Sequence, residues 1–203
     1  MWQKISAAGK KIIQSGLTEA NFGNISVRSA SGNSFIITKT GTALDEIGVN
    51  DLIEMPIYNS EEDTLTDPAV SVIIEKTASS ETPVHRRIYQ ETEAKTILHA
   101  HCPYSVVMSI LENEAGNGSL IPIDSEGKLF LREIPIISGG IGSAELAENA
   151  AAAFKSGETK GVVILSHGTI AIGETLEEAY NITAQLEHAA KIKYIYAKAK
   201  NLF

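Results

Sequence analysis

The chain has 203 residues, of which 43% are hydrophobic and 21% are charged, and its formal net charge is −8. This length suits one globular domain with a sizeable core, so we expect residues 1–203 to form a single domain. The acidic balance excludes the basic surface that binds nucleic acids or anionic membranes, and we expect neither as a partner. An anionic substrate is still compatible, because helix N-termini and metal ions hold phosphate groups locally.

Cysteine content and the N-terminal segment indicate where the protein works. The single cysteine, Cys102, cannot form a disulfide within the chain, which favours a reducing compartment. Residues 1–16 predict an amphipathic helix and not a signal peptide. No stretch approaches the ~20 apolar residues of a membrane span. We therefore expect a cytoplasmic protein, with Cys102 as a buried apolar residue instead of a nucleophile or ligand.

The first half of the chain combines helical and alternating hydrophobic patterns with turn-forming residues. These patterns predict, in chain order, a helix at 2–15, a hairpin of strands at 25–28 and 34–38, an edge strand at 52–58, and a mainly loop segment at 59–72 in which 69–75 could be a strand.

The second half alternates short apolar runs with helical patterns. It predicts a helix at 80–91 with Ser80 as N-cap, a strand at 95–101, a helix at 103–111, a loop at 113–128, a strand at 133–137, a helix at 143–155, strands at 161–166 and 169–173, and a final helix at 175–200. Strands mixed with segregated helices predict an α/β fold with three α/β/α layers around a mixed sheet.

Three histidines are candidate metal ligands. His99 and His101 lie two residues apart in a predicted strand, so both imidazoles point to the same side and can meet one ion. His167 follows another apolar strand, where a turn presents its side chain at the sheet edge. Three protein ligands with an open position are typical of a catalytic metal. The alternatives are strand-end histidines with ordinary hydrogen bonds, and a turn at His167 whose special backbone angle comes from Gly168.

Glu81 is the candidate acid or base. It follows Ser79 and Ser80 at a predicted helix start, where free N–H groups and the helix dipole suit an anion such as phosphate. A carboxylate at that place can act as a general base, but it could equally stabilise its own helix start. His85, one turn later, could line the site, although helix packing or a contact with Glu81 is favoured.

Two further turns carry polar groups and glycine. Gly23 and Asn24 lie in one, and Thr40 and Gly41 in the other, each with an ordinary turn as the alternative. The glycine-rich run at 138–143 is not a dinucleotide motif, because its spacing puts Glu145 where a glycine is required. We interpret it as a flexible turn with Ser143 as the N-cap of the next helix.

Taken together, these segments resemble the class II aldolase/adducin family, and within it the L-fuculose-1-phosphate aldolases. The resemblance extends over nearly the whole chain and rests on five short motifs in order. They are G-N-I-S at 23–26, T-G at 40–41, S-S-E at 79–81, H-x-H at 99–101 and H-G at 167–168.

The resemblance implies a three-layer fold whose mixed sheet is mainly antiparallel, and a homotetramer. It implies Zn²⁺, or Mn²⁺ or Co²⁺, on His99, His101 and His167, with Glu81 as the acid/base. The substrate phosphate would be held by six residues: Gly23, Asn24, Thr40, Gly41, Ser79 and Ser80. The implied reaction cleaves a small ketose 1-phosphate, such as L-fuculose 1-phosphate, to dihydroxyacetone phosphate and an aldehyde through an enediolate.

Other activities occur on the same scaffold, and the fold does not choose between them. A sugar-phosphate epimerase or a dehydratase of the methylthioribulose-phosphate type is the alternative, and a non-catalytic adducin-like binding module is a weaker one. Family aldolases bring a tyrosine from a neighbouring subunit in the loop after the H-x-H helix. Residues 113–128 of this chain contain no tyrosine.

Overall fold

The computed structural model describes residues 1–58 and 68–200. Its strands are β1 (Asn24–Arg28), β2 (Ser34–Thr38), β3 (Leu52–Pro56), β4 (Thr96–Ala100), β5 (Ser119–Leu120), β6 (Ile134–Ile137), β7 (Gly161–Ile164) and β8 (Gly168–Gly173). In this part of the chain they form one sheet in the order β3-β2-β1-β4-β8-β7-β6-β5. The β6–β7 pair is parallel and the other neighbours are antiparallel. The expected mixed, mainly antiparallel sheet is confirmed.

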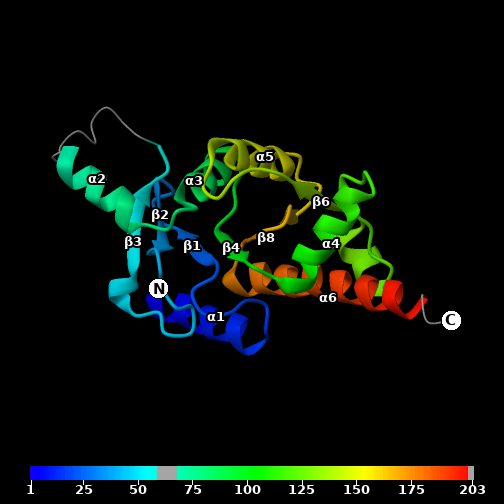
Figure 1. The fold of residues 1–203 in the computed structure, drawn as a ribbon. Helices are drawn as coiled ribbons and strands as arrows, with labels where there is room; N and C mark the ends of the chain where they lie inside the picture. Colours follow the sequence, from blue (N-terminus) through cyan, green and yellow to red (C-terminus); the bar gives the residue numbers. More distant parts are fainter. Residues whose placement is uncertain (59–67, 201–203) are drawn as a thin grey trace.

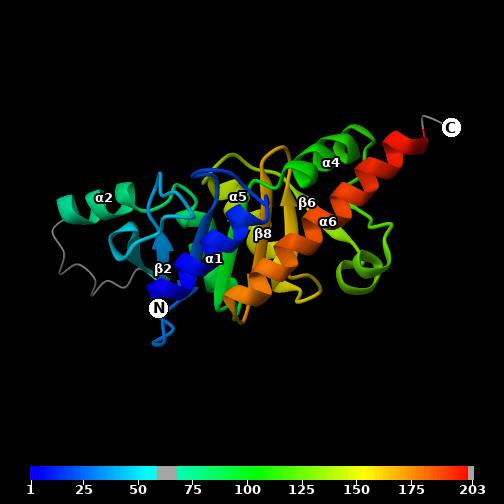
Figure 2. The ribbon, with the colours of Figure 1, turned by 90° about the horizontal axis from the view of Figure 1, so that it is seen from below.

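Helices cover both faces of the sheet. They are α1 (Trp2–Gln14), α2 (Pro68–Thr77), α3 (Thr82–Glu91), α4 (Pro103–Glu114), α5 (Ala144–Lys155) and α6 (Leu176–Lys200), with short helical turns η1 (Val49–Asp51) and η3 (Gly127–Leu131). Helices α3 and α5 lie on one face, and α1 and α6 on the other (Figure 1). Figure 2 shows α1 and α6 crossing the strands from that second side. The three-layer α/β/α architecture is therefore confirmed.

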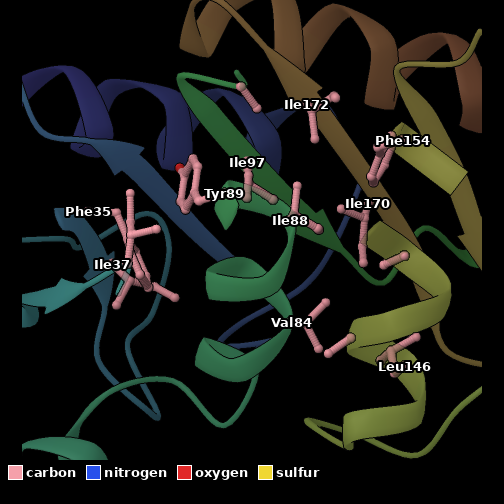
Figure 3. Close-up of a cluster of buried hydrophobic side chains, with 14 of the residues drawn as sticks. Phe35, Ile37, Val84, Ile88, Tyr89, Ile97, Leu146, Phe154, Ile170 and Ile172 are labelled. Carbon is pink, nitrogen blue, oxygen red and sulfur yellow. The ribbon is translucent and has the colours of Figure 1, made fainter. Parts of the chain in front are cut away.

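Among the described residues, three hydrophobic clusters hold the layers together, and the central strand β4 contributes to two of them. Ile97 packs under α3 and α5 in one cluster with Ile88 and with Ile172, its partner on β8 (Figure 3). Its neighbour Leu98 packs on the opposite face with residues of α1 and α6. Successive side chains of a strand point to opposite faces, so His99 shares the face of Ile97. The alternation of side chains along β4 therefore places His99 on the face that α3 and α5 cover.

The segment before α3 differs from the prediction. Residues 68–77 form α2, so the expected loop is wrong for 68–72 and the possible strand at 69–75 is wrong, while 59–67 lie outside the described residues. The β-branched run around Ile73 favours a strand by propensity. Pro68, however, occupies the first helical position, where its missing N–H costs nothing. At the other end, Thr77 Oγ1 donates to Ile73 O at 2.7 Å. Short elements β5 and η3 likewise lie in or next to the loop expected at 113–128.

Strand directions bring four segments together at one end of the central strands, which is called the edge of the sheet below. Because β1 runs antiparallel to both β2 and β4, the start of β1 lies beside the ends of those strands, and Asn24 pairs with His99. Strand β8 is antiparallel to β4, so its start lies at the same edge, with Thr169 opposite Ala100. Residues distant in sequence therefore meet there. Within the described residues, no helix is long and apolar enough to cross a membrane.

Candidate metal and acid–base site

The three candidate histidines converge at this edge. Their ring centroids are 4.9 Å apart for His99 and His101, 4.7 Å for His99 and His167, and 4.6 Å for His101 and His167. One nitrogen from each ring lies within 4.8 Å of the others. The Nε2 atoms of His99 and His101 are 3.1 Å apart. Two nitrogens bound tetrahedrally to zinc lie about 3.3 Å apart, so the cluster matches the size of a single ion.

Hydrogen bonding orients His99. Its Nδ1 lies 2.9 Å from the carbonyl oxygen of Thr169, which can only accept, so Nδ1 carries the proton of the neutral ring. The Nε2 lone pair then faces the other two imidazoles. A carbonyl oxygen that accepts from the far nitrogen of a histidine commonly fixes the tautomer of a metal ligand. The geometry thus prepares His99 to bind a cation.

The electrostatic environment keeps all three rings neutral. Burial, followed by the neighbouring His167 and His101, lowers the pKa of His99 well below its usual range. Burial also lowers the pKa of His101, and burial together with His101 lowers the pKa of His167 to about 4. Protons therefore compete weakly for the ring nitrogens at neutral pH, which leaves three lone pairs available to one metal ion.

A tight turn presents His167. Its N–H donates to Ile164 O at 3.1 Å, and the intervening Ser166 has a left-handed φ of 56°. The special backbone angle thus falls at Ser166, and the expectation that Gly168 would supply it is wrong. Gly168 is needed for a different reason, since a Cβ there would lie 2.4 Å from Ala100 O. This close approach of β8 to the end of β4 brings His167 against the paired histidines.

The Phe22 loop covers His101. The Phe22 ring stacks on the imidazole with centroids 5.4 Å apart and an interplanar angle of 5°. Gly23 follows with φ +101°, and a Cβ at that position would lie 2.4 Å from His99 O. Only glycine allows the loop to pass this close to the backbone of the H-x-H strand. The next residue, Asn24, is buried beside His99, and its Oδ1 has no partner within the described chain.

Helix α3 aims its N-terminus at the same edge. Arg28, at the far end of β1, donates to Tyr89 O at 2.7 Å in the last turns of the helix. Ser26, nearer the edge, hydrogen-bonds His85 at 2.7 Å in the middle of α3. The helix therefore runs antiparallel to β4, and Glu81 at its start lies toward the histidine edge.

Glu81 is held by a loop, not by its own helix. It is the N-cap residue of α3, so the prediction that Ser80 is the N-cap is wrong, and its side chain makes no capping hydrogen bond. The glycine-rich run instead donates Gly142 N–H to Glu81 Oε1 at 2.7 Å. The backbone N–H of Glu81 donates to Ser79 Oγ at 3.3 Å.

The Glu81 carboxylate suits proton transfer. The residue is 3% exposed, and its Oε2 is buried without a hydrogen-bond partner among residues 1–58 and 68–200. Burial raises the pKa of Glu81, and the Gly142 N–H opposes that rise in part. A carboxyl group whose pKa moves toward neutrality exchanges protons more readily near physiological pH. The sequence pattern predicts only a turn at Gly142. Its position in a glycine-rich run that ends at the N-cap of α5 is the feature that could have indicated a contact with Glu81.

The two polar turns expected near an anion also reach this edge. Ser79 N–H donates to Thr38 O at 3.2 Å, and Thr40 N–H donates to Thr77 O at 3.1 Å, so the Thr40–Gly41 turn lies against the start of α3. Gly41 has φ +75° and open space around its Cα. The six expected residues therefore lie in three segments at one edge of the sheet: Gly23 and Asn24, Thr40 and Gly41, and Ser79 and Ser80.

His85 and Cys102 are both fully buried, with different consequences. His85 is packed inside the protein, one of the two favoured alternatives, with its Nδ1 hydrogen-bonded to Ser26 Oγ, and burial lowers the pKa of His85 to about 3. Burial raises the pKa of the Cys102 thiol to about 12, so it stays protonated. The interpretation of Cys102 as a buried small residue is confirmed. The sequence pattern does not predict the hydrogen bond between His85 and Ser26, which lies inside the G-N-I-S motif.

Known proteins resemble this chain over most of its length. The sequence model described as "Class II Aldolase and Adducin N-terminal domain" matches residues 3–194. An L-fuculose phosphate aldolase of Methanococcus maripaludis is 29% identical over 175 residues, covering 85% of this chain and 84% of that protein. A 3-oxo-tetronate 4-phosphate decarboxylase of Haemophilus influenzae is 26% identical over 186 residues, covering 91% and 82%.

A solved structure gives the same picture. The L-fuculose-1-phosphate aldolase from Thermus thermophilus superposes with a TM-score of 0.82 at 29% identity, covering 98% of this chain and 95% of that one. The order of layers described above is therefore the fold of that relative. In this chain, the three histidines that could hold a metal ion lie at the edge of the central sheet.

Proposed function

The chain belongs to the family of class II aldolases and adducin N-terminal domains, and we propose that it is a divalent-metal-dependent aldolase of small phosphorylated sugars. The substrate is a ketose 1-phosphate such as L-fuculose 1-phosphate, cleaved to dihydroxyacetone phosphate and an aldehyde. The observation that carries this proposal is the convergence of His99, His101 and His167 at the edge toward which Glu81 is directed.

The donor set favours zinc. Three neutral imidazoles with an open fourth position are typical of a catalytic zinc site, and Mn²⁺ or Co²⁺ can take the same ligands. When bound there, such a cation supplies Lewis-acid stabilisation for the negative charge that retro-aldol cleavage leaves on the ketone oxygen. The protein's part is to hold the three lone pairs in place, and the Thr169 carbonyl does this for His99.

Glu81 is proposed as the acid/base. Cleavage breaks the C3–C4 bond, its electron pair moves toward the ketone to give an enediolate, and the C4 hydroxyl passes its proton to the ionised Glu81 carboxylate as the aldehyde forms. The enediolate must then gain a proton at C3 to become dihydroxyacetone phosphate. A buried carboxyl with a raised pKa can hold that proton, and the unpaired Oε2 is the oxygen from which it is delivered.

The substrate phosphate is proposed to bind the three polar segments at the same edge. The residues are Gly23, Asn24, Thr40, Gly41, Ser79 and Ser80. The hydrogen bonds from Ser79 N–H to Thr38 O and from Thr40 N–H to Thr77 O bring two of these segments together at the N-terminus of α3. This supports the assignment, because backbone N–H groups and the helix dipole favour an anion. A phosphate held away from the reacting carbons orients the sugar for cleavage. We also propose a single domain, a homotetramer and a cytoplasmic location, from the resemblance and the composition.

A decarboxylase is the second candidate, since the Haemophilus influenzae relative carries that name. Loss of carbon dioxide from a 3-oxo acid also leaves charge on a ketone oxygen, so the same groups can serve it. Epimerases and dehydratases of the methylthioribulose-phosphate type remain alternatives. The complete histidine set speaks against an adducin-like binding module.

A sugar-phosphate panel tests the proposal. Purified protein loaded with Zn²⁺, Mn²⁺ or Co²⁺ is incubated with ketose 1-phosphates, ketose 5-phosphates and a 3-oxo-tetronate 4-phosphate, with and without a chelator. Triose phosphate, carbon dioxide, water loss and epimers are measured separately. The aldolase proposal expects chelator-sensitive release of dihydroxyacetone phosphate together with an aldehyde from a ketose 1-phosphate. Carbon dioxide released from the 3-oxo acid, dehydration or epimerisation, with no aldehyde formed from any ketose 1-phosphate, would overturn it.

A further inference from the structure

A buried polar chain lies behind the proposed site and has no part in the chemistry described so far. Ser26 Oγ lies 2.7 Å from His85 Nδ1 and 2.8 Å from the hydroxyl of Tyr89. The three residues are 0–1% exposed, inside a layer that is otherwise apolar. Figure 3 shows Tyr89 on α3 beside Ile97 of β4. Buried polar groups are kept where hydrogen bonds satisfy them, so each proton of this chain can be followed.

Counting protons fixes the tautomer of His85. If Tyr89 donates to Ser26 and Ser26 donates to His85 Nδ1, both hydroxyl protons are used and the imidazole proton lies on Nε2. In the reverse direction, the Tyr89 proton has no acceptor in the described part of the chain. The first arrangement leaves one polar atom unpaired and the reverse leaves two. The network therefore makes His85 Nε2 an N–H donor.

His85 lies one helical turn after Glu81. Its Nε2 is buried without a partner among the described residues, and so is Oε2 of Glu81. The two residues are four apart at the start of α3, where i and i+4 side chains are neighbours. One atom is a donor without an acceptor, and the other is an acceptor without a donor.

We propose that His85 is a positioning residue that directs Oε2 of Glu81 through its Nε2–H and one bridging water molecule, with Ser26 and Tyr89 fixing its tautomer. This inference rests on the proposed role of Glu81 in proton transfer. His85 contributes neither a metal bond nor a proton. It restricts the carboxylate so that its unpaired oxygen faces the substrate carbon, while Gly142 holds the other oxygen.

Two substitutions separate positioning from packing. His85→Asn keeps an acceptor for Ser26 near the Nδ1 position but loses the donor at Nε2. His85→Gln keeps a donor near the Nε2 position but loses the acceptor for Ser26. We expect kcat for triose phosphate release to fall about 10- to 100-fold in His85→Asn, with KM and bound metal unchanged, and to recover to within about threefold of wild type in His85→Gln. A packing role predicts the opposite order, which would overturn the proposal.

Nuclear magnetic resonance of the metal-free protein tests the same idea without turnover. Long-range ¹H–¹⁵N spectra should show the Nε2–H tautomer of His85 in wild type and a mixture of tautomers in Ser26→Ala. The carboxyl ¹³C signal of Glu81, assigned by its loss in Glu81→Gln, should move in His85→Asn and return in His85→Gln. An Nδ1–H tautomer in wild type, or a Glu81 signal insensitive to both variants, would overturn the proposal. If wild type cleaves no sugar phosphate, the proposed function fails and these spectra still decide the role of His85.

Discussion

Replacing Gly142 with alanine tests how tightly the acid/base must be held. Gly142 N–H donates to Glu81 Oε1 at 2.7 Å, from a backbone with φ +63°. A Cβ there would lie 2.1 Å from Ser80 O, whereas real Cβ contacts stay above 3.0 Å. The loop must therefore withdraw by roughly 1 Å, because a packed backbone offers no other space. A hydrogen bond that begins at 2.7 Å does not survive this displacement.

The size of the effect follows from that bond. A hydrogen bond to a charged group is worth about 1.5–3 kcal/mol, which corresponds to about 10- to 100-fold in kcat if it serves only to place the carboxylate. The left-handed alanine costs a further ~1–2 kcal/mol of stability. Loss of the N–H also raises the pKa of Glu81 further, because this donor opposes the effect of burial. The pH at which Glu81 ionises in the Gly142→Ala variant therefore lies above that of wild type.

The assay is release of dihydroxyacetone phosphate by metal-loaded protein across a pH series. Gly140→Ala is the control in the same loop, because its Cβ would meet nothing closer than 3.9 Å. Gly157→Ala controls for backbone strain, since it has φ +73° and no atom within 4 Å of its Cβ. If folded Gly142→Ala keeps a kcat within twofold of Gly140→Ala, the loop does not position Glu81 and the reasoning is refuted.

Three further predictions concern the metal and the carboxylate. His99→Ala should lose stoichiometric metal in elemental analysis, whereas His188→Ala, on an exposed part of α6, should keep it; equal loss would refute the ligand assignment. Glu81→Gln should keep the metal but lose turnover, and the metal-free variant should melt above wild type at pH 8 and converge with it near pH 4. Burial raises the pKa of Glu81 in the folded protein above its ordinary value of 4.5, so ionised Glu81 destabilises the fold as the pH rises above 4.5, and glutamine removes that cost. Equal melting temperatures of the two proteins at every pH would contradict this cost of burial. Since the pKa of His167 is lowered to about 4, competition titrations should show metal affinity changing little between pH 8 and pH 6 and weakening as the pH approaches 4, and a steep loss already near pH 6.5 would contradict the lowered pKa.

Much of the site was predictable because it depends on local periodicity. Alternation along the strand places His99 and His101 on one side, and the apolar strand before His167 predicts a turn at a sheet edge. Strand directions then leave little freedom in where these segments meet. The sequence pattern alone left His167 uncertain, since the approach of β8 to β4 depends on Gly168 fitting beside Ala100 O.

Other features depend on contacts that local patterns do not encode. The Glu81 carboxylate could cap its own helix or reach another segment, and the choice is made by a loop 61 residues away in the chain. The run around Ile73 has strand propensity, but Pro68 starts a helix there. The unusual backbone angle falls on Ser166 although Gly168, two residues later, is the better candidate by propensity. For Glu81 a tertiary contact thus decides between two local possibilities, whereas α2 begins at Pro68 despite the strand propensity of the residues that follow.

Anomalous diffraction at the zinc edge, from crystals grown with one equivalent of Zn²⁺, tests the central claim most directly. The account predicts one peak per chain, about 2.0–2.1 Å from a ring nitrogen of each of His99, His101 and His167. A fully occupied zinc bound elsewhere, with these three imidazoles left unligated, would contradict it.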